Sequence, residues 1–201
     1  MVLPRITSVL AGLLFVFSSN GQTTQDSLDL WRDMKTYYLV NKKLDYDSIL
    51  NFMPPKFFTI APKTFMKNAL KSTFENSDFR MGFDTFAYGV VQPLVKFETV
   101  LGTMVGYDMT LSITFTGEQD SGYVEMMKGI MSEKYGKENV RVSPTNDSKL
   151  EIKTPGKKMF ALKEPEWDSW KFLEDKRAEG DERQKKMIET VIPKAMLEYF
   201  K

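Results

Sequence analysis

The chain has 201 residues, of which 42% are hydrophobic and 13% aromatic, and its 28 basic and 27 acidic residues leave a net charge of +1. It contains no cysteine and no histidine, which excludes disulfides, zinc–thiolate and iron–sulfur sites, histidine-ligated zinc and serine–histidine–aspartate catalysis. The near-neutral charge lacks the basic footprint of a nucleic-acid-binding protein and offers no electrostatic attraction to anionic membranes.

The first 21 residues have the pattern of a secretory signal peptide. A basic residue precedes an apolar run over 9–17, and the small residues Ser19 and Gly21 stand at the −3 and −1 positions of an expected cut before Gln22. The apolar run is too short to cross a bilayer, which needs roughly 20 apolar residues. We therefore expect an exported mature chain, 22–201, that is periplasmic or extracellular. It would have no lipid anchor, because no cysteine could carry one, and no integral membrane segment.

Helical spacing of apolar residues predicts three N-terminal helices. The first covers about 26–41, and the second covers 46–53 and ends before Pro54, because a residue that precedes proline avoids the α region. The third begins near Pro62, which suits a first helical turn. Its apolar stripe consists of Phe65, Met66, Ala69, Leu70 and Phe74.

The apolar period then changes from helical to two, which predicts strands over 79–88, 94–101 and 105–116. In the last of these, apolar residues at odd positions alternate with small or polar residues at even positions. We expect the odd row, including Leu111 and Ile113, to face a core and the even row, including Ser112, to be wet or polar-lined. A strand of this length is also expected to contain a bulge.

The remaining chain predicts one helix, several short strands and a closing helix. The helix covers 121–135, and strands follow near Val140 and over 150–153, 158–163 and 170–173, with turn residues such as Pro155-Gly156 between them. A last helix covers 181–191, and Pro193 separates it from a short segment at 196–200. This order indicates a single α+β domain over 22–201, with N-terminal helices on a curved, cone-like antiparallel sheet, an inserted helix and a C-terminal helix.

Three stretches carry a resemblance to a known family. They are Asp45-Tyr46 … Met53-Pro54 … Phe58-Thr59-Ile60-Ala61-Pro62-Lys63 … Met66 … Leu70, Met159-Phe160-Ala161-Leu162-Lys163-Glu164-Pro165 … Trp170-Lys171-Phe172-Leu173-Glu174, and Ile192-Pro193-Lys194. They are similar to small exported proteins of Bacteroidota, over nearly the whole mature chain. The order of elements also resembles the nuclear-transport-factor-two-like (cystatin-like) cone of ketosteroid isomerases and polyketide cyclases. The helix at 121–135 is an insertion that minimal cones lack. The resemblance implies an exported envelope protein and brings no assigned activity with it.

Aromatic and methionine residues mark the candidate binding site. Methionine adapts to varied apolar ligands, and pockets are mostly apolar with few polar groups. We therefore expect an apolar cavity between the N-terminal helices and the inner face of the sheet, with ordinary core packing as the alternative. The candidate ligand-binding residues, all expected on core-facing positions, are Trp31, Tyr38, Phe65, Phe97, Tyr107 and Phe115.

Catalytic and metal sites find little support in the sequence. Cone isomerases use an aspartate base with a tyrosine donor, and Asp108 beside Tyr107 and Asp84 near Tyr88 are the candidate pairs. Consecutive strand residues point to opposite faces, so we assign no catalytic residue. Three further aspartates, Asp45, Asp47 and Asp120, lack EF-hand spacing and are interpreted as helix caps and solvated groups. We expect no metal and no cofactor.

The sequence thus predicts an exported envelope protein that is not an enzyme and binds a small apolar ligand or a partner segment in a cone-shaped pocket. One alternative is a cone-fold isomerase or hydrolase that uses a carboxylate and a tyrosine. Another is a structural adaptor that docks through an edge strand. We expect no nucleic-acid partner.

Overall fold

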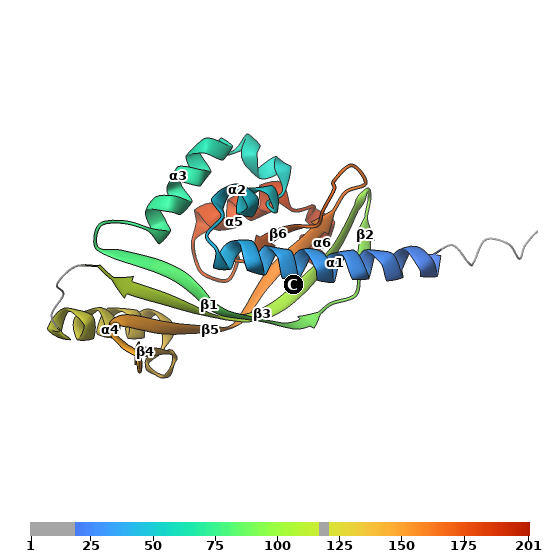
Figure 1. Cartoon of the computed structure of the whole chain (residues 1–201). Coiled ribbons are helices and arrows are strands. Elements are labelled where there is room, and N and C mark those ends of the chain that lie inside the picture. The colour runs from blue at the N-terminus through green and yellow to red at the C-terminus, as the bar shows by residue number, and fades with distance from the viewer. Residues whose placement is uncertain (1–18, 117–120) are drawn as a thin grey trace, which may run out of the picture.

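A computed structural model describes residues 19–116 and 121–201. Over these residues the chain is an α+β protein in which helices pack on one 6-stranded antiparallel sheet, which confirms the predicted fold class (Figure 1). Most of the predicted signal peptide lies outside the described residues. The first helix, α1 (Ser19–Lys42), includes the position of the expected cut before Gln22 in its first turn.

The predicted N-terminal helices are present. They are α1, α2 (Tyr46–Asn51), the 3-10 helix η1 (Pro55–Thr59) and α3 (Lys63–Phe74). Asp45 is the N-cap of α2, and its carboxylate accepts the backbone N–H of Ser48 at 3.2 Å, as the capping interpretation of this aspartate predicts. In the view of Figure 1, α2 and α3 stand above the long strands.

The sheet is built around its two longest strands, β3 and β5. Its strands are β1 (Phe79–Val91), β2 (Val95–Phe97), β3 (Val100–Phe115), β4 (Val140–Ser143), β5 (Asn146–Lys163) and β6 (Lys171–Glu174). The order across the sheet is β1-β3-β5-β4, with β2 paired to β3 and β6 paired to β5. Between the strands lie α4 (Ser121–Tyr135) and the 3-10 helix η2 (Lys137–Asn139), and the chain ends in α5 (Glu182–Val191) and α6 (Lys194–Tyr199).

Three predicted strands had wrong boundaries. The predicted strand 94–101 is a hairpin of β2 and the start of β3, and its turn includes Glu98 at a φ of 56°. The predicted strands 150–153 and 158–163 are one strand, β5, because Pro155-Gly156 forms a bulge and not a turn. Gly156 has a φ of 68° there, and its N–H donates to the Asp108 carboxylate at 2.7 Å.

Bulges in the strands on both sides of β3 curve the sheet. In β1 the register with β3 shifts between Phe83 and Thr85 and again between Tyr88 and Val91. In β5 it shifts opposite Tyr107 and Met109. The extra residues thus belong to the neighbours of β3 and not to β3 itself.

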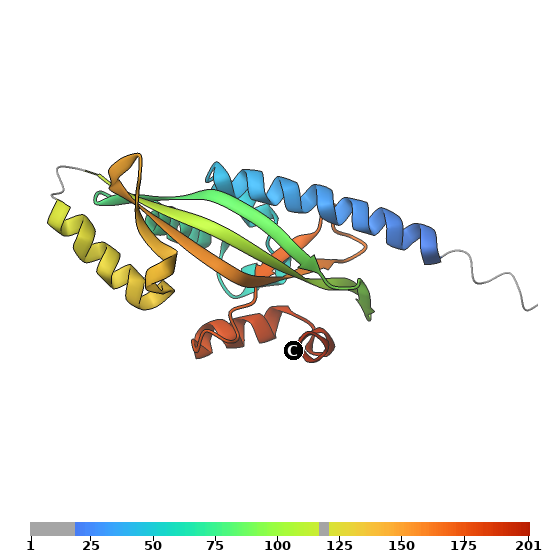
Figure 2. The same ribbon diagram turned by 90° about the horizontal axis from the view of Figure 1, so that it is seen from below.

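The two rows of side chains on β3 pack against different helices. On the odd row, Val105 and Tyr107 pack with α1, while Leu111 and Ile113 pack with α4. On the even row, Met104 packs with α5 and α6, which lie across the strands from α1 (Figure 2). Leu111 and Ile113 are 8% and 4% exposed, which confirms their predicted burial.

One member of the even row differs from expectation. Ser112 is only 5% exposed, and its hydroxyl donates to the Asp84 carboxylate at 2.9 Å. Asp84 also pairs with Lys149 at 2.8 Å. The even row is therefore polar-lined but not open to water at this point, because a neighbouring side chain covers it.

Candidate ligand-binding site

A cavity of about 470 Å³ lies between the end of α1, α2, α3, the sheet and the start of α5; we call it the α3 cavity. Its size falls in the range of about 300–1,000 Å³ that small-molecule sites occupy. Most of its lining is apolar, including Met53, Met66, Leu70, Phe74, Phe83 and Met109. These residues come from separate segments of the chain, so the cavity depends on the tertiary fold.

The helix α3 forms one wall of this cavity. Its residues Met66, Leu70 and Phe74 recur at a spacing of four and so share one face of the helix, and all three line the cavity. None of the 12 residues of α3, all of them described, is buried. An amphipathic helix normally buries its apolar face against a core. Here that face borders the cavity, and α3 touches the sheet where the rings of Phe74 and Phe83 lie 5.3 Å apart.

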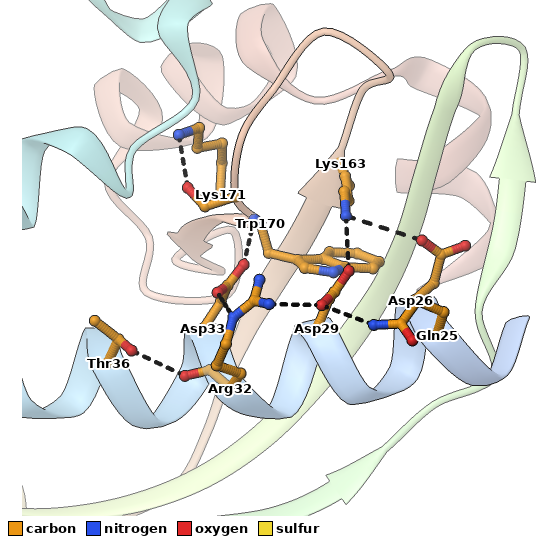
Figure 3. Close-up of polar contacts among 10 residues, drawn as sticks. Gln25, Asp26, Asp29, Arg32, Asp33, Thr36, Lys163, Trp170 and Lys171 are labelled. Carbon is orange, nitrogen blue, oxygen red and sulfur yellow. Dashed lines mark hydrogen bonds and ion pairs between the residues drawn. The ribbon is translucent and has the colours of Figure 1, made fainter. Parts of the chain in front are cut away.

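A polar network fixes α1, which forms another wall (Figure 3). Asp33 is 5% exposed, accepts the backbone N–H of Trp170 at 2.9 Å and lies 3.0 Å from the Arg32 Nε atom. Further along α1, Asp29 lies 3.4 Å from the Nζ atom of Lys163 on β5. These contacts hold α1 against the β5–β6 connection, so this wall is set before any ligand arrives.

Tyr107 supplies a polar group inside the apolar lining. Its ring stacks on Phe86, with centroids 4.6 Å apart and planes 8° apart, and it is 6% exposed. Burial raises the pKa of Tyr107 far above its ordinary value, and the adjacent charge of Glu174 and a hydrogen bond to that carboxylate raise it further. Tyr107 therefore stays protonated and acts as a hydrogen-bond donor.

Two lysines surround Glu174. The Nζ atom of Lys157 lies 3.7 Å from Glu174 and 2.5 Å from Glu179, and the Nζ atom of Lys176 lies 3.4 Å from Glu174. Burial lowers the pKa of Lys157, but the hydrogen bond to Glu179 and the two carboxylate charges outweigh burial and leave it raised. One edge of the cavity is thus a network of ion pairs.

Other polar groups reach the cavity from α1 and α5. Burial, followed by the charge of Glu174, raises the pKa of Tyr37 to about 12. The Asn41 amide donates to the Tyr37 carbonyl oxygen at 2.8 Å. The Oε1 atom of Gln184 is buried and has no hydrogen-bond partner within 19–116 and 121–201. Because an unpaired buried acceptor is unfavourable, a ligand group that donates to Gln184 would be stabilised there.

The six predicted ligand-binding residues do not form one site. All six are described, and Tyr107 alone lines the α3 cavity. Tyr38 packs on Phe86 with ring centroids 6.0 Å apart. Phe97 belongs to the cluster under α5 and α6, and Phe115 to the cluster under α4.

Trp31 and Phe65 were wrongly expected on core-facing positions, since they are 49% and 64% exposed. Trp31 touches the edge of the sheet through Tyr88, with ring centroids 6.4 Å apart. Phe65 immediately precedes Met66, and one residue rotates a helix by about 100°. The cavity-facing row of α3 therefore begins at Met66 and leaves Phe65 in solvent.

The polar residues of the site were missed from sequence. Glu174 and Gln184 lie in a neutral charge run, which is typical of a solvated segment. The pairing of Met159 with Glu174 in the β5–β6 ladder places this carboxylate on the row that holds Tyr107. No local sequence pattern reveals how β5 and β6 pair, so the position of Glu174 near Tyr107 could not be predicted from the sequence.

The candidate aspartate–tyrosine pairs do not form. Asp108 is exposed and accepts the Gly156 N–H, on the opposite face of β3 from Tyr107. Asp84 pairs with Lys149, while the Tyr88 hydroxyl donates to the Met34 carbonyl oxygen.

Among the described residues there is no group of three or more side chains suited to hold a metal ion. Within the same residues, no helix has both the length and the apolar character needed to cross a membrane.

The fold and the site together define an α+β protein with a largely apolar cavity beneath an amphipathic helix. Comparison of the chain with protein-family models, with curated proteins and with solved structures finds no match in any of the three.

Proposed function

We propose that this protein is a non-enzymatic binding protein that holds one small, mostly apolar ligand in the α3 cavity. The observation that carries the proposal is the apolar face of α3, which borders a cavity of about 470 Å³ and buries none of its residues in a core. A ligand there would complete the packing of Met66 and Leu70. Each Å² of apolar surface removed from water contributes roughly 25 cal/mol.

The polar edge of the cavity supports orientation of the ligand. The unpartnered Gln184 oxygen is an acceptor at one point, and the Tyr107 hydroxyl, whose proton is directed to Glu174, has an oxygen that can accept at another. A few placed polar groups in an apolar lining are typical of sites that bind one ligand in one orientation.

A cone-fold isomerase or hydrolase is the second candidate, because the Glu174 carboxylate faces the Tyr107 hydroxyl at the cavity. One feature favours binding over catalysis. The Glu174 side chain, which would be the base, is 28% exposed and is shared between Lys157 and Lys176. Substrate turnover that is lost in Glu174→Gln would support the enzyme instead.

The proposed location is outside the cytoplasm, in an envelope of the Bacteroidota type, and the proposed fold relation is to the cystatin-like cone. The signal-like pattern of the first 21 residues and the three resembling stretches support both. The structural adaptor is the remaining alternative. It would dock through an edge strand such as β1, where Val90 is 71% exposed.

Titration of the folded chain with the environment-sensitive dye N-phenyl-1-naphthylamine tests the proposal. We expect one saturable site, a changed affinity in Tyr107→Ala, and a large loss in Leu70→Trp, because the indole would occupy the cavity. The matched control is Leu39→Trp on α1, where the leucine is 43% exposed. Equal binding by the two tryptophan variants, or dye binding only by unfolded protein, would refute the proposal and favour the adaptor.

A further inference from the structure

A second hollow adjoins the α3 cavity on the sheet, beside the end of α4; we call it the α4 hollow. Its volume is about 540 Å³, and apolar side chains such as Met81 and Leu111 form part of its lining. The two spaces share Phe74, Phe83, Met109, Glu174 and Lys176 as lining residues. They therefore lie side by side on the sheet, and we call the two spaces together the trough.

Positive charge is in excess at the α4 hollow. Its lining includes Lys134, Lys157 and Lys176 but only two acidic residues, Glu174 and Glu179. Those two carboxylates are paired with Lys157 and Lys176. Among the described residues Lys134 has no acidic partner at ion-pair distance, and its Nζ atom lies 5.2 Å from the centre of the Tyr135 ring. One exposed cation at the end of α4 thus faces the trough without a counter-charge.

We propose that the ligand of this protein is a long-chain amphiphile with one anionic head group, a carboxylate or a phosphate monoester. The chain occupies the α3 cavity, and the head lies in the α4 hollow near Lys134 and Lys176. This inference rests on the proposed binding function. An elongated ligand fits two adjoining spaces, because a compact one would fill the first and leave the half-buried Met81 of the second in contact with water.

The lining chemistry agrees with a flexible chain. Methionines from three segments, Met53, Met66 and Met109, face the α3 cavity, and unbranched thioether side chains adapt to a flexible partner. The head group would add a carboxylate or phosphate contact to lysine, which is a charge-assisted interaction.

Competition against bound N-phenyl-1-naphthylamine tests the inference on the full chain. The competitors are tetradecanoic acid, tetradecyl phosphate and tetradecan-1-ol, each below its micelle concentration and at low salt. We expect at least one of the two anions to displace the dye about fivefold more tightly than the alcohol, as a partly exposed ion pair allows. The ranking of acid and phosphate then identifies the head group.

Two variants locate the head group. Lys134→Gln should remove most of the advantage of the anion and leave alcohol binding unchanged. The control is Lys128→Gln on the same helix, where the lysine pairs with Glu125 at 3.1 Å and does not line the trough. Equal binding of anion and alcohol, or equal effects of both variants, would overturn the anionic head while leaving the proposed function standing. Failure of the dye itself to bind would overturn both.

Discussion

Replacing Leu70 with phenylalanine tests whether the α3 cavity is open. Leu70 lines this cavity from α3 and is half-buried. Leu150 on β5 provides the matched control, because it is 0% exposed and packs in the core cluster under α4. The same chemical change is thus made once beside free volume and once inside a filled core.

The expected magnitudes follow from the free space around each side chain. At Leu70 the larger ring extends into the cavity, where each additional buried methylene equivalent contributes about 0.8 kcal/mol. The free energy of unfolding should therefore stay within about 0.5 kcal/mol of the wild type or rise slightly. At Leu150 the ring must displace neighbours such as Ile113, and overpacking costs about 1–3 kcal/mol.

Urea unfolding, followed by circular dichroism and by tryptophan fluorescence, measures both effects. Trp170 is fully buried and gives a native-state signal far from both substitutions in sequence. Unchanged m-values would show that the two states being compared are the same. If Leu70→Phe destabilised the protein as much as Leu150→Phe, the cavity would be filled and the reasoning refuted.

Three further predictions concern the fold. Ile113→Ala should lower the free energy of unfolding by about 2–5 kcal/mol in the same urea assay. Ser112→Ala should lower it by about 1 kcal/mol, through the lost hydrogen bond to the Asp84 carboxylate. Equal costs would contradict the assignment of these residues to the odd and even rows of β3. Asp33→Ala should cost about 1–3 kcal/mol, because it leaves the buried N–H of Trp170 unpaired; an unchanged melting temperature would contradict this anchoring role. The raised pKa of Tyr107 contributes stability that is complete below about pH 10, where unfolded tyrosine keeps its proton, and is lost as pH rises further. Melting temperatures should therefore fall above that pH, and less steeply in Tyr107→Phe; identical slopes would contradict the burial of this hydroxyl.

Local signals in the sequence were sufficient for most of the helix boundaries, although α1 begins at Ser19 and not near residue 26 as predicted. The start of α5 follows from Asp181, whose carboxylate caps the N–H groups of Arg183 and Gln184. The ends of α4 coincide with the predicted 121–135 because helical spacing and Gly136 mark them. The hairpin before β3 was missed because Glu98 is an unusual residue for a left-handed turn position.

The candidate site was harder to predict, since apolar periodicity identifies buried rows but not the element that covers them. Three of the predicted residues point from the sheet toward cores, but each is covered by a different helix. Phe97 lies under α6, Tyr107 under α1 and Phe115 under α4. Only Tyr107 remains beside open space. The cavity depends on how far α3 stands from the sheet, and no short stretch of sequence contains that distance.

Methyl NMR provides the most direct test of ligand binding in the α3 cavity. The chain has 13 methionines, and five of them, Met53, Met66, Met109, Met159 and Met187, line the cavity. Met196 is a buried residue of α6, and Met126 is 54% exposed on α4. The full chain, labelled at methionine methyl carbons, would be titrated with N-phenyl-1-naphthylamine. Binding in the cavity predicts saturable shifts at Met53, Met66 and Met187 with Met126 and Met196 unchanged. Shifts confined to Met126 or Met196, or none at all, would contradict it.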